Sequence, residues 1–400
     1  MPHVGYLNTE LVDIELPTIP THLPYTIDDY TLAYSLGISN KLLWWLLIHP
    51  EQSYTVLKIP KASGKGIRTL HAPSRFMSKV QTALLKFYLN PLQATLGSHV
   101  AAYRTGISIT DTVKQHVFPC TICATKPPNA PKINHECPQR GTHLHIDLKD
   151  FFPSTRPAWI RKYFENVGYS PYVANLLASL LTVRANRHPL SLIKKPIDAP
   201  NAVSSIEENK IDPTEQTYGG VPQGFQGSGA ICNLIADKKL DTPLLTYFEE
   251  IKTRYNTKVV YTRYSDDLEI SLSALLPKNQ IRQMFCDIYA IIEASGFKIN
   301  KTKTRSHRKY QRRIILGAVV NEKVNCLRTK WNFFRAIVHN CCTGSITEQA
   351  QRMDKTREDF IAWLRGNINW INTLNPKRGE KLLTKFKTAL AKESERLPHV

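Results

Sequence analysis

The chain has 400 residues and a formal net charge of +20, because 53 lysines and arginines outweigh 33 acidic residues. Its apolar runs are too short to cross a membrane, and its polar, acidic N-terminus lacks the pattern of a secretory signal. We therefore expect a soluble protein, cytoplasmic if it is bacterial. The charge favours a nucleic-acid partner over the alternative of a basic protein that is merely soluble.

The first 53 residues predict an N-terminal arm followed by helices. Pro17, Pro20 and Pro24 indicate an extended arm with little periodicity. Residues 27–49 then show the spacing of apolar residues that is typical of helices.

A β-hairpin with a cationic tip is predicted next. Residues 54–60 and 67–71 have the pattern of strands, and the Gly/Lys-rich stretch between them predicts the turn. Lys61 and Arg68 flank this turn, and an arginine can grip a phosphate through two parallel hydrogen bonds. The hairpin could therefore close over phosphates; the alternative is a plain exposed hairpin that its lysines keep soluble.

Two helices are expected after this hairpin. The first is amphipathic and covers residues 75–90. Its end is predicted at Asn90, because Pro91 disfavours helical backbone in the residue before it. The second helix is capped by Ser108 or Thr110.

A proline-rich insertion over residues 118–141 carries a candidate zinc site. Cys120 and Cys123 form a C-x-x-C pair, and His135 and Cys137 follow it. Four such ligands could hold a tetrahedral zinc ion. The alternative is a loop with unrelated thiols, because the second half is compressed and lacks a second C-x-x-C. The remaining cysteines have the pattern of ordinary thiols, and disulfides are not expected.

Residues 142–154, THLHIDLKDFFPS, predict a short buried strand that ends in acidic residues. Leu144, Ile146 and Leu148 alternate along it, and Asp147 stands between the last two. A carboxylate inside an apolar strand is costly unless it binds something positive. Asp147 is therefore a candidate metal ligand; the alternative is that it lies on a solvated face of the strand.

Residues 218–234 form a glycine-rich loop that leads into a helix beginning near Ser228. Such a loop lets the backbone approach a base pair or a phosphate closely. Gln223 is the polar side chain in this stretch of small residues. The alternative is a simple connection, since glycine-rich loops are common.

The stretch VVYTRYSDDLEISL, residues 259–272, predicts a second hairpin with two carboxylates at its turn. Asp266 and Asp267 crowd negative charge into a small volume, and a divalent metal is the natural counter-charge. The alternative is a solvated Asp-Asp turn.

The C-terminal part predicts a further hairpin and a helical bundle. The hairpin covers residues 312–327, and three basic amphipathic helices cover 330–340, 347–365 and 379–395, with Trp370 in the last connection. The bundle could lie along a nucleic-acid duplex. The alternative is an ordinary helical domain whose charges form a solvated face.

Eight blocks in this order resemble the reverse transcriptases of bacterial retroelements, the group that includes group II intron, retron and defence-associated enzymes. The tetrad YSDD fits the YxDD pattern of these enzymes, with serine in the variable place. The resemblance runs from about residue 54 to the C-terminus. The blocks are IPKASGKGIRTLHAP, AYRTGISI, HIDLKDFFPS, GGVPQGFQGSGAICNL, YTRYSDDLEI, GFKINKTKT, LGAVVNEKVN and LRGNINWINTLNP.

This resemblance implies an α+β fold, a right-hand polymerase with fingers, a ferredoxin-like palm of antiparallel sheet plus helices, and a helical thumb. The N-terminal arm and helices would occupy residues 1–53, and the fingers 54–141 with the insertion 118–141. The palm would occupy residues 142–310, and the primer-grip hairpin and thumb 311–400.

The resemblance also implies an RNA-directed DNA polymerase, a nucleotidyltransferase that makes cDNA from an RNA template with dNTPs and two Mg²⁺ ions. Asp147, Asp266 and Asp267 would hold the metal ions, and Lys303 would protonate the leaving pyrophosphate. The residues that would contact the incoming dNTP are Lys61, Arg68, Asp150, Phe151, Phe152, Gln223 and Gly224. Phe152 would be the gate that excludes the ribose 2′-hydroxyl.

Several readings of the biological role stay open. A retron or another anti-phage defence system would supply a noncoding RNA and, in some systems, an effector protein. Template-independent or protein-primed DNA synthesis, RNA synthesis, and a non-catalytic RNA-binding protein on the same scaffold are the alternatives.

Overall fold

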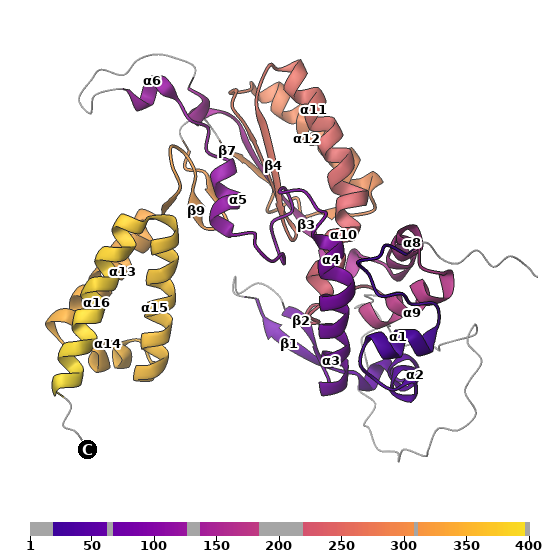
Figure 1. Ribbon diagram of the computed structural model, residues 1–400. Coiled ribbons are helices and arrows are strands. Elements are labelled where there is room, and N and C mark those ends of the chain that lie inside the picture. Colours follow the sequence, from indigo (N-terminus) through magenta and orange to yellow (C-terminus); the bar gives the residue numbers. More distant parts are fainter. Residues whose placement is uncertain (1–18, 62–66, 126–136, 184–218, 308–310, 397–400) are drawn as a thin grey trace, which may run out of the picture. The chain divides into compact units, whose positions relative to one another are not determined.

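The structure is a computed structural model that describes residues 19–61, 67–125, 137–183, 219–307 and 311–396 (Figure 1). Its contacts divide the chain into two compact units, each built from two separate stretches. Unit 1 combines residues 1–96 and 150–236, and unit 2 combines residues 97–149 and 237–400. The predicted extended arm lies mostly outside the described residues.

Unit 1 consists of one two-stranded hairpin and a set of helices. Strands β1 (Tyr54–Pro60) and β2 (Ile67–Pro73) pair antiparallel over their whole length, which confirms the predicted hairpin. Side-chain caps begin several of the helices: Asp28 and Thr31 form a capping box, and Ser39, Ser74 and Ser170 each accept a backbone N–H. The helices are α1 (Asp29–Ser35), α2 (Asn40–Ile48), α3 (Arg75–Ala83), α4 (Asn90–Gln93), α7 (Phe151–Ser154), α8 (Pro157–Val167), α9 (Pro171–Leu181) and α10 (Ser228–Ala236).

The helix after this hairpin continues past the predicted end at Asn90. A π-helical turn, η2 (Leu84–Leu89), follows α3, and α4 continues the helix with Pro91 in its first turn. In a π turn each N–H bonds to the carbonyl five residues back instead of four, so the pattern of backbone pairing shifts where the turn ends. Pro91, which has no N–H, stands at this shift, where a backbone N–H would have no partner. The prediction that Pro91 ends the helix is therefore wrong.

Unit 2 is built on an antiparallel sheet of five strands in the order β4-β5-β3-β6, with β7 also pairing with β3. The long strands are β3 (His143–Lys149), β4 (Val259–Tyr264) and β5 (Asp267–Leu272). Helices α11 (Thr242–Arg254) and α12 (Lys278–Ala294) contact the sheet at β4 and β6 and contact each other (Figure 1). The short elements are α5 (Ile109–Gln115), α6 (Thr121–Ala124), η3 (Pro138–Arg140), η4 (Asp237–Asp241), β6 (Lys298–Ile299) and β7 (Arg305–His307).

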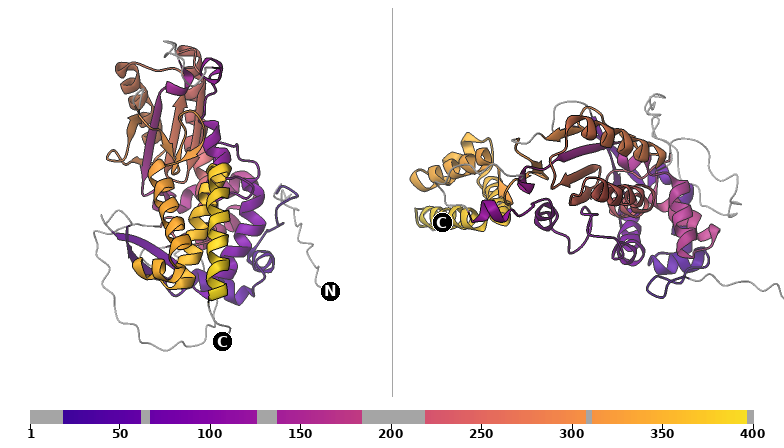
Figure 2. Two further views of the ribbon diagram at one scale, coloured as in Figure 1. Left: turned by 90° about the vertical axis from the view of Figure 1, so that its left-hand side faces the viewer. Right: turned by 90° about the horizontal axis from the view of Figure 1, so that it is seen from above.

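The C-terminal part of unit 2 is a small sheet followed by a helical bundle, drawn in orange to yellow in Figure 2. A common apolar cluster joins the sheet to the helices and includes Phe334, Phe360 and Leu364. The strands are β8 (Ile314–Ile315), β9 (Ala318–Val319) and β10 (Asn325–Cys326), and the helices are α13 (Arg328–Thr343), α14 (Ile346–Arg352), α15 (Arg357–Leu374) and α16 (Pro376–Arg396).

One predicted helix of this bundle is in fact two. The expected helix over residues 347–365 is interrupted after α14, where Asp354 has a positive φ of 50° and Thr356 caps α15. A non-glycine residue in the left-handed region ends a right-handed helix. Trp370 lies within α15, so its predicted place in a connection is wrong. None of the helices in the described ranges is long and apolar enough to span a bilayer.

Candidate active site

The two acids of the YSDD tetrad lie at the tip of the predicted hairpin. Tyr264 pairs with Asp267 at the end of the ladder, and Ser265 and Asp266 form the two-residue turn. Ser265 has a positive φ of 60°, which a tight hairpin turn requires. The prediction of a hairpin with both carboxylates at its tip is confirmed.

Asp147 lies directly beside this tip. In the register of β3 and β5, Asp147 stands opposite Asp267. The backbone N–H of the next residue, Leu148, donates to the carbonyl of Asp266 over 2.8 Å. Asp147 is only 2% exposed, so the alternative of a solvated strand face is wrong. Three carboxylates from two distant parts of the sequence thus converge at the ends of two adjacent strands.

Lys303 is the cation that meets this group. It follows β6 in a turn in which its N–H donates to the carbonyl of Asn300, and Asn300 in turn donates to the carbonyl of Asp147. The Lys303 Nζ lies 2.7 Å from Asp147 Oδ2. This hydrogen bond, together with the charges of the three acids, raises the pKa of the Lys303 ammonium. The Lys303 side chain is 59% exposed, and the neighbouring Lys301 is exposed too.

Burial and mutual repulsion raise the pKa values of the two hairpin carboxylates. Burial, and then the charge of Asp147, raise the pKa of Asp266. Burial and the charge of Asp266 raise the pKa of Asp267 to about 6. Because carboxylates that share a small volume resist ionising together, a bound cation is what would stabilise all three in their charged form.

A buried polar ladder extends from Asp267 away from the tip, and sequence reasoning missed it. His145 places its Nε2 3.7 Å from Asp267 Oδ1 and its Nδ1 2.9 Å from Glu269 Oε1. His143 Nε2 lies 3.1 Å from the other oxygen of Glu269. These contacts with the two histidines outweigh burial and lower the pKa of Glu269 to about 2. For His145, burial is outweighed by Glu269, and its pKa is raised.

The polar ladder was readable in the sequence as a second alternation. His143, His145 and Asp147 are spaced two apart, as are Asp267 and Glu269, so each set shares one face of its strand. The sequence prediction used only the apolar residues between them. The face is covered, because the His116 ring of α5 contacts hydroxyls of both β4 and β5.

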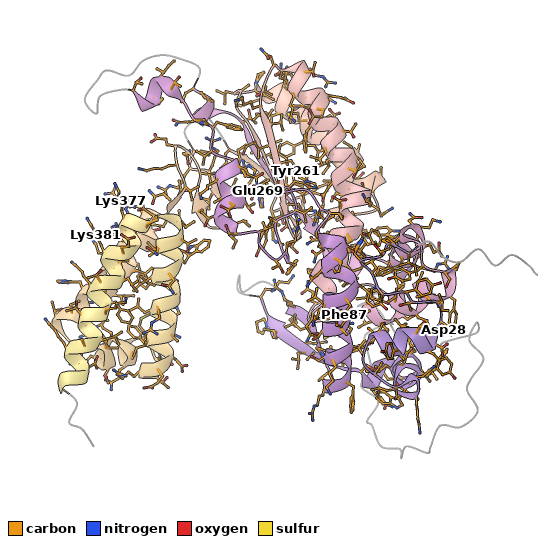
Figure 3. The ribbon with its side chains drawn as sticks, viewed as in Figure 1. Asp28, Phe87, Tyr261, Glu269, Lys377 and Lys381 are labelled. Atoms are coloured by element: carbon orange, nitrogen blue, oxygen red, sulfur yellow. The ribbon has the colours of Figure 1, made fainter. Side chains whose placement is uncertain are left out.

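A buried ion pair supports the hairpin from its other strand. The Arg263 guanidinium on β4 contacts both oxygens of Asp241 in η4, at 2.7–3.0 Å, and both residues are 0% exposed. Its Nη1 also donates to the carbonyl of Ser265 over 3.4 Å. Tyr261 completes the group by donating its hydroxyl to Asp241 over 2.6 Å; Figure 3 labels Tyr261 on β4 and Glu269 on β5.

The glycine-rich loop is anchored within unit 1. The Gln223 carbonyl accepts the N–H of His71 on β2 over 2.7 Å. Gly224 has a φ of +124°, and an added Cβ would stand 2.5 Å from the carbonyl oxygen of His71. An L-residue with a side chain is therefore excluded at this close approach of the loop to the strand. The predicted helix start at Ser228 is confirmed.

The residues that follow β3 belong to unit 1. Asp150 has a positive φ of 51° and is the N-cap residue of α7. Phe151 is buried, whereas Phe152 is only partly covered and meets Phe151 edge-on at 5.7 Å. Since Asp150 follows Asp147 by three residues, their Cα atoms lie within about 11 Å of each other.

The cationic hairpin tip is only partly described. Lys61 is exposed immediately after β1, and Arg68 is exposed on β2 opposite Ile59. Residues 62–66 lie outside the described residues. Gln223 and Gly224 lie against His71 of β2, the strand that also carries Arg68.

The structure brings together three of the four predicted zinc ligands. Sγ atoms of Cys120, Cys123 and Cys137 all lie within 4.8 Å of one another. His135 lies outside the described residues. The cysteines of the described part form no disulfide.

The donor set at the hairpin tip fits a magnesium site. Mg²⁺ prefers carboxylate oxygens, and Asp147, Asp266 and Asp267 offer them without a competing thiol or imidazole as ligand. Two other groups in the described chain bring their ligand atoms closer together, within 4.8 Å of one another. These groups are the three cysteines and the set of His99, Asp237 and Asp241. The second of these groups already has Arg263 as its counter-charge.

Comparison with known proteins identifies the class. The family described as reverse transcriptase (RNA-dependent DNA polymerase) matches residues 59–323. The chain therefore belongs to the reverse transcriptase family, has its α+β right-hand polymerase fold, and is an RNA-directed DNA polymerase, a nucleotidyltransferase.

Curated relatives show which reverse transcriptases the chain is similar to: those of bacterial retrons. The chain is 27% identical over 369 residues to the retron Mx65 reverse transcriptase of Myxococcus xanthus, covering 91% of this chain and 72% of that protein. It is 24% identical over 389 residues to the retron Ec86 reverse transcriptase of Escherichia coli, covering 96% and 94%. The predicted resemblance to bacterial retroelement enzymes is thereby confirmed.

Solved structures with some similarity include telomerases. Telomerase from Candida albicans, in complex with a fragment of telomeric RNA, aligns with a TM-score of 0.38 and 13% identity over 86% of this chain. Apo telomerase from Candida tropicalis aligns with a TM-score of 0.43 and 11% identity over 84%. The chain spans 64% and 58% of those two telomerase chains.

Proposed function

We propose that the chain copies an RNA template into cDNA at the carboxylates of the β3–β5 edge, with two Mg²⁺ ions as cofactors. One observation carries the proposal. Asp147 stands in register opposite Asp267, beside Asp266 and within 2.7 Å of a lysine, although these residues come from three distant parts of the sequence. A structural acid would need only one partner. Three converging acids, of which Asp266 and Asp267 have raised pKa values, fit a divalent-metal cage.

Bound at these carboxylates, the two metal ions would stabilise the negative charge that develops on the attacking 3′-oxygen and on the leaving pyrophosphate. The chain's own groups do the rest. His145, whose other ring nitrogen lies 2.9 Å from Glu269, would place positive charge 3.7 Å from the Asp267 carboxylate, and His143 meets the second oxygen of Glu269. Lys303 is a protonated amine beside Asp147, and it would give its proton to the pyrophosphate oxygen as that group leaves.

The nucleotide contacts belong to unit 1 in this proposal. Lys61 and Arg68 would contact the triphosphate, as would the start of α7 at Asp150 and Phe151. Gln223 and Gly224 would contact the new base pair. Phe152, which is partly exposed where Phe151 is buried, is the ring that can meet the ribose and exclude a 2′-hydroxyl.

The biological setting that we propose is a retron in the bacterial cytoplasm. The template would be a structured noncoding RNA, and the net charge of +20 supports binding to RNA and to the cDNA product. A role in anti-phage defence, with an effector protein as partner, belongs to the same proposal.

The test is DNA synthesis with dNTPs, Mg²⁺ and a primed RNA template. We expect heteroduplex product from the wild type, and a loss of at least about 10³-fold in Asp266→Ala, because an essential metal ligand is removed. Glu358→Gln is the matched control, since its side chain is 80% exposed on α15 and its substitution should leave synthesis unchanged. Undiminished synthesis by Asp266→Ala would refute the assignment.

Sequencing of the product separates the alternatives. A copy of the added RNA supports template-directed synthesis, whereas product unrelated to the template supports template-independent or protein-primed synthesis. No metal-dependent incorporation with any template would favour a non-catalytic RNA-binding protein.

A further inference from the structure

Three cysteines meet in unit 2 shortly before the strand that carries Asp147. Cys120 is the N-cap residue of α6, Cys123 lies within α6, and Cys137 immediately precedes η3. The Sγ atoms of Cys123 and Cys137 are 3.5 Å apart, and all three Sγ atoms lie within 4.8 Å of one another. Two thiolates on one tetrahedral zinc, each at about 2.3 Å, stand about 3.8 Å apart. A disulfide needs about 2.05 Å, so the spacing fits shared metal ligation better than a disulfide bond.

Two of the three thiols are buried. Cys120 is 6% exposed and Cys137 is 7% exposed, and Cys123 is partly covered. Thiols on an unrelated surface loop have no reason to converge in this way from positions 14 residues apart or more. The arrangement supplies three of the four ligands of a closed zinc site.

A buried arginine provides a second, independent observation. Arg313, just before β8, is 2% exposed, and its charge interacts with Cys137. Its Nη2 donates to the carbonyl of Gln139, whereas its Nη1 has no hydrogen-bond partner among the described residues. A buried guanidinium without a counter-charge is costly. Among the described residues Arg313 forms no salt bridge, and three thiolates around one Zn²⁺ carry one net negative charge that would supply its counter-charge.

We propose that Cys120, Cys123 and Cys137 bind one structural zinc ion through their thiolates, with Arg313 as the charge partner of the site. The fourth position of the tetrahedron takes a donor outside this group. The ion would hold the insertion against two neighbouring segments of unit 2, the start of β3 and the chain before β8. On one side, Thr142 at the start of β3 donates to the carbonyl of Ala274. On the other side, Arg313 donates to the carbonyl of Gln139, and the chain continues from Arg313 into the β8–β9 hairpin.

Elemental analysis of the full-length protein, purified without chelator from zinc-supplemented cells, tests the site. We expect about one zinc per chain in the wild type and in the control Cys286→Ser, whose thiol is exposed on α12. Cys123→Ser should lose at least about nine-tenths of the metal under the same conditions. Arg313→Met should release zinc to a chelator about tenfold faster, because it removes the partner of the ligands.

Cobalt binding keeps the test decisive if Cys123→Ser fails to fold. Wild-type protein stripped of zinc and titrated with Co²⁺ should show the visible bands of a tetrahedral thiolate site, and Zn²⁺ should displace them. The proposal is overturned if the wild type holds less than about a tenth of a zinc and gives no such bands. It is equally overturned if Cys123→Ser keeps its zinc, or if thiol-blocked lysate contains a Cys123–Cys137 disulfide. These outcomes do not depend on polymerase activity, since Asp266→Ala should retain zinc and lose synthesis.

Discussion

The buried pair of Arg263 and Asp241 should be among the most sensitive points of unit 2. Both residues are 0% exposed, and three contacts of 2.7–3.0 Å join them. Breaking a buried pair by removing one partner leaves an uncompensated charge and costs about 3–5 kcal/mol. Asp241→Asn keeps the side-chain volume and an acceptor for Tyr261, so we expect it to lower the free energy of unfolding by about 3 kcal/mol. Arg263→Met should lower it by about 3–5 kcal/mol.

The assay is urea unfolding of the full chain, followed by circular dichroism, for both single variants and the double variant. The double variant removes both charges, so its loss should be smaller than the sum of the single losses by about 2 kcal/mol or more. Lys114→Met is the control, because Lys114 and Asp111 form a solvent-exposed ion pair at 3.5 Å, whose loss should leave the free energy of unfolding nearly unchanged. Since Arg263 also holds the Ser265 carbonyl, DNA synthesis by Arg263→Met should fall in kcat more than it changes in KM. Single losses below about 1 kcal/mol, or strict additivity, would refute the reasoning.

Three further predictions concern the chemistry. Lys303→Met should lower kcat about 10²-fold or more and flatten the alkaline limb of the pH–rate profile, while Lys301→Met should leave both unchanged; equal effects of the two would contradict the general-acid role. Phe152→Ala should raise incorporation of ribonucleotides over dNTPs in a competition assay, and an unchanged ratio would reject the gate. The folded-state pKa of Asp267 is raised to about 6, so the stability that its proton provides is complete below the unfolded value of 3.8 and is lost as the pH rises through about 6. Mg²⁺ needs the ionised form, so its apparent affinity, read as a thermal shift, should fall about tenfold between pH 7.5 and pH 5; a pH-independent shift would contradict this.

The sequence predicted the strands of the site because their patterns are local. The hairpin that ends in Asp266 and Asp267 alternates with period two, and its turn is marked by a short polar run. Asp147 was predictable because an acid interrupts an apolar strand. The register of β3 and β5 places it opposite Asp267. These signals need no knowledge of long-range packing.

What the sequence did not predict depends on contacts between distant segments. Arg263 and Asp241 are 22 residues apart, and neither shows in its own segment that the other will neutralise it. His145 and Glu269 are 124 residues apart, so neither strand alone shows that its polar residues will be paired. The continuation of the helix past Pro91 depends on a π turn, which no local preference of these residues reveals.

The central claim is that Asp147, Asp266 and Asp267 together hold the metal ions of DNA synthesis. The most direct measurement is an anomalous difference map from crystals of the chain with Mn²⁺, primed RNA template and an incoming dNTP. We predict two peaks about 3.5–4 Å apart, in contact with carboxylate oxygens of all three residues. Peaks that avoid these carboxylates, or that lie instead at His99, Asp237 and Asp241, would contradict the account.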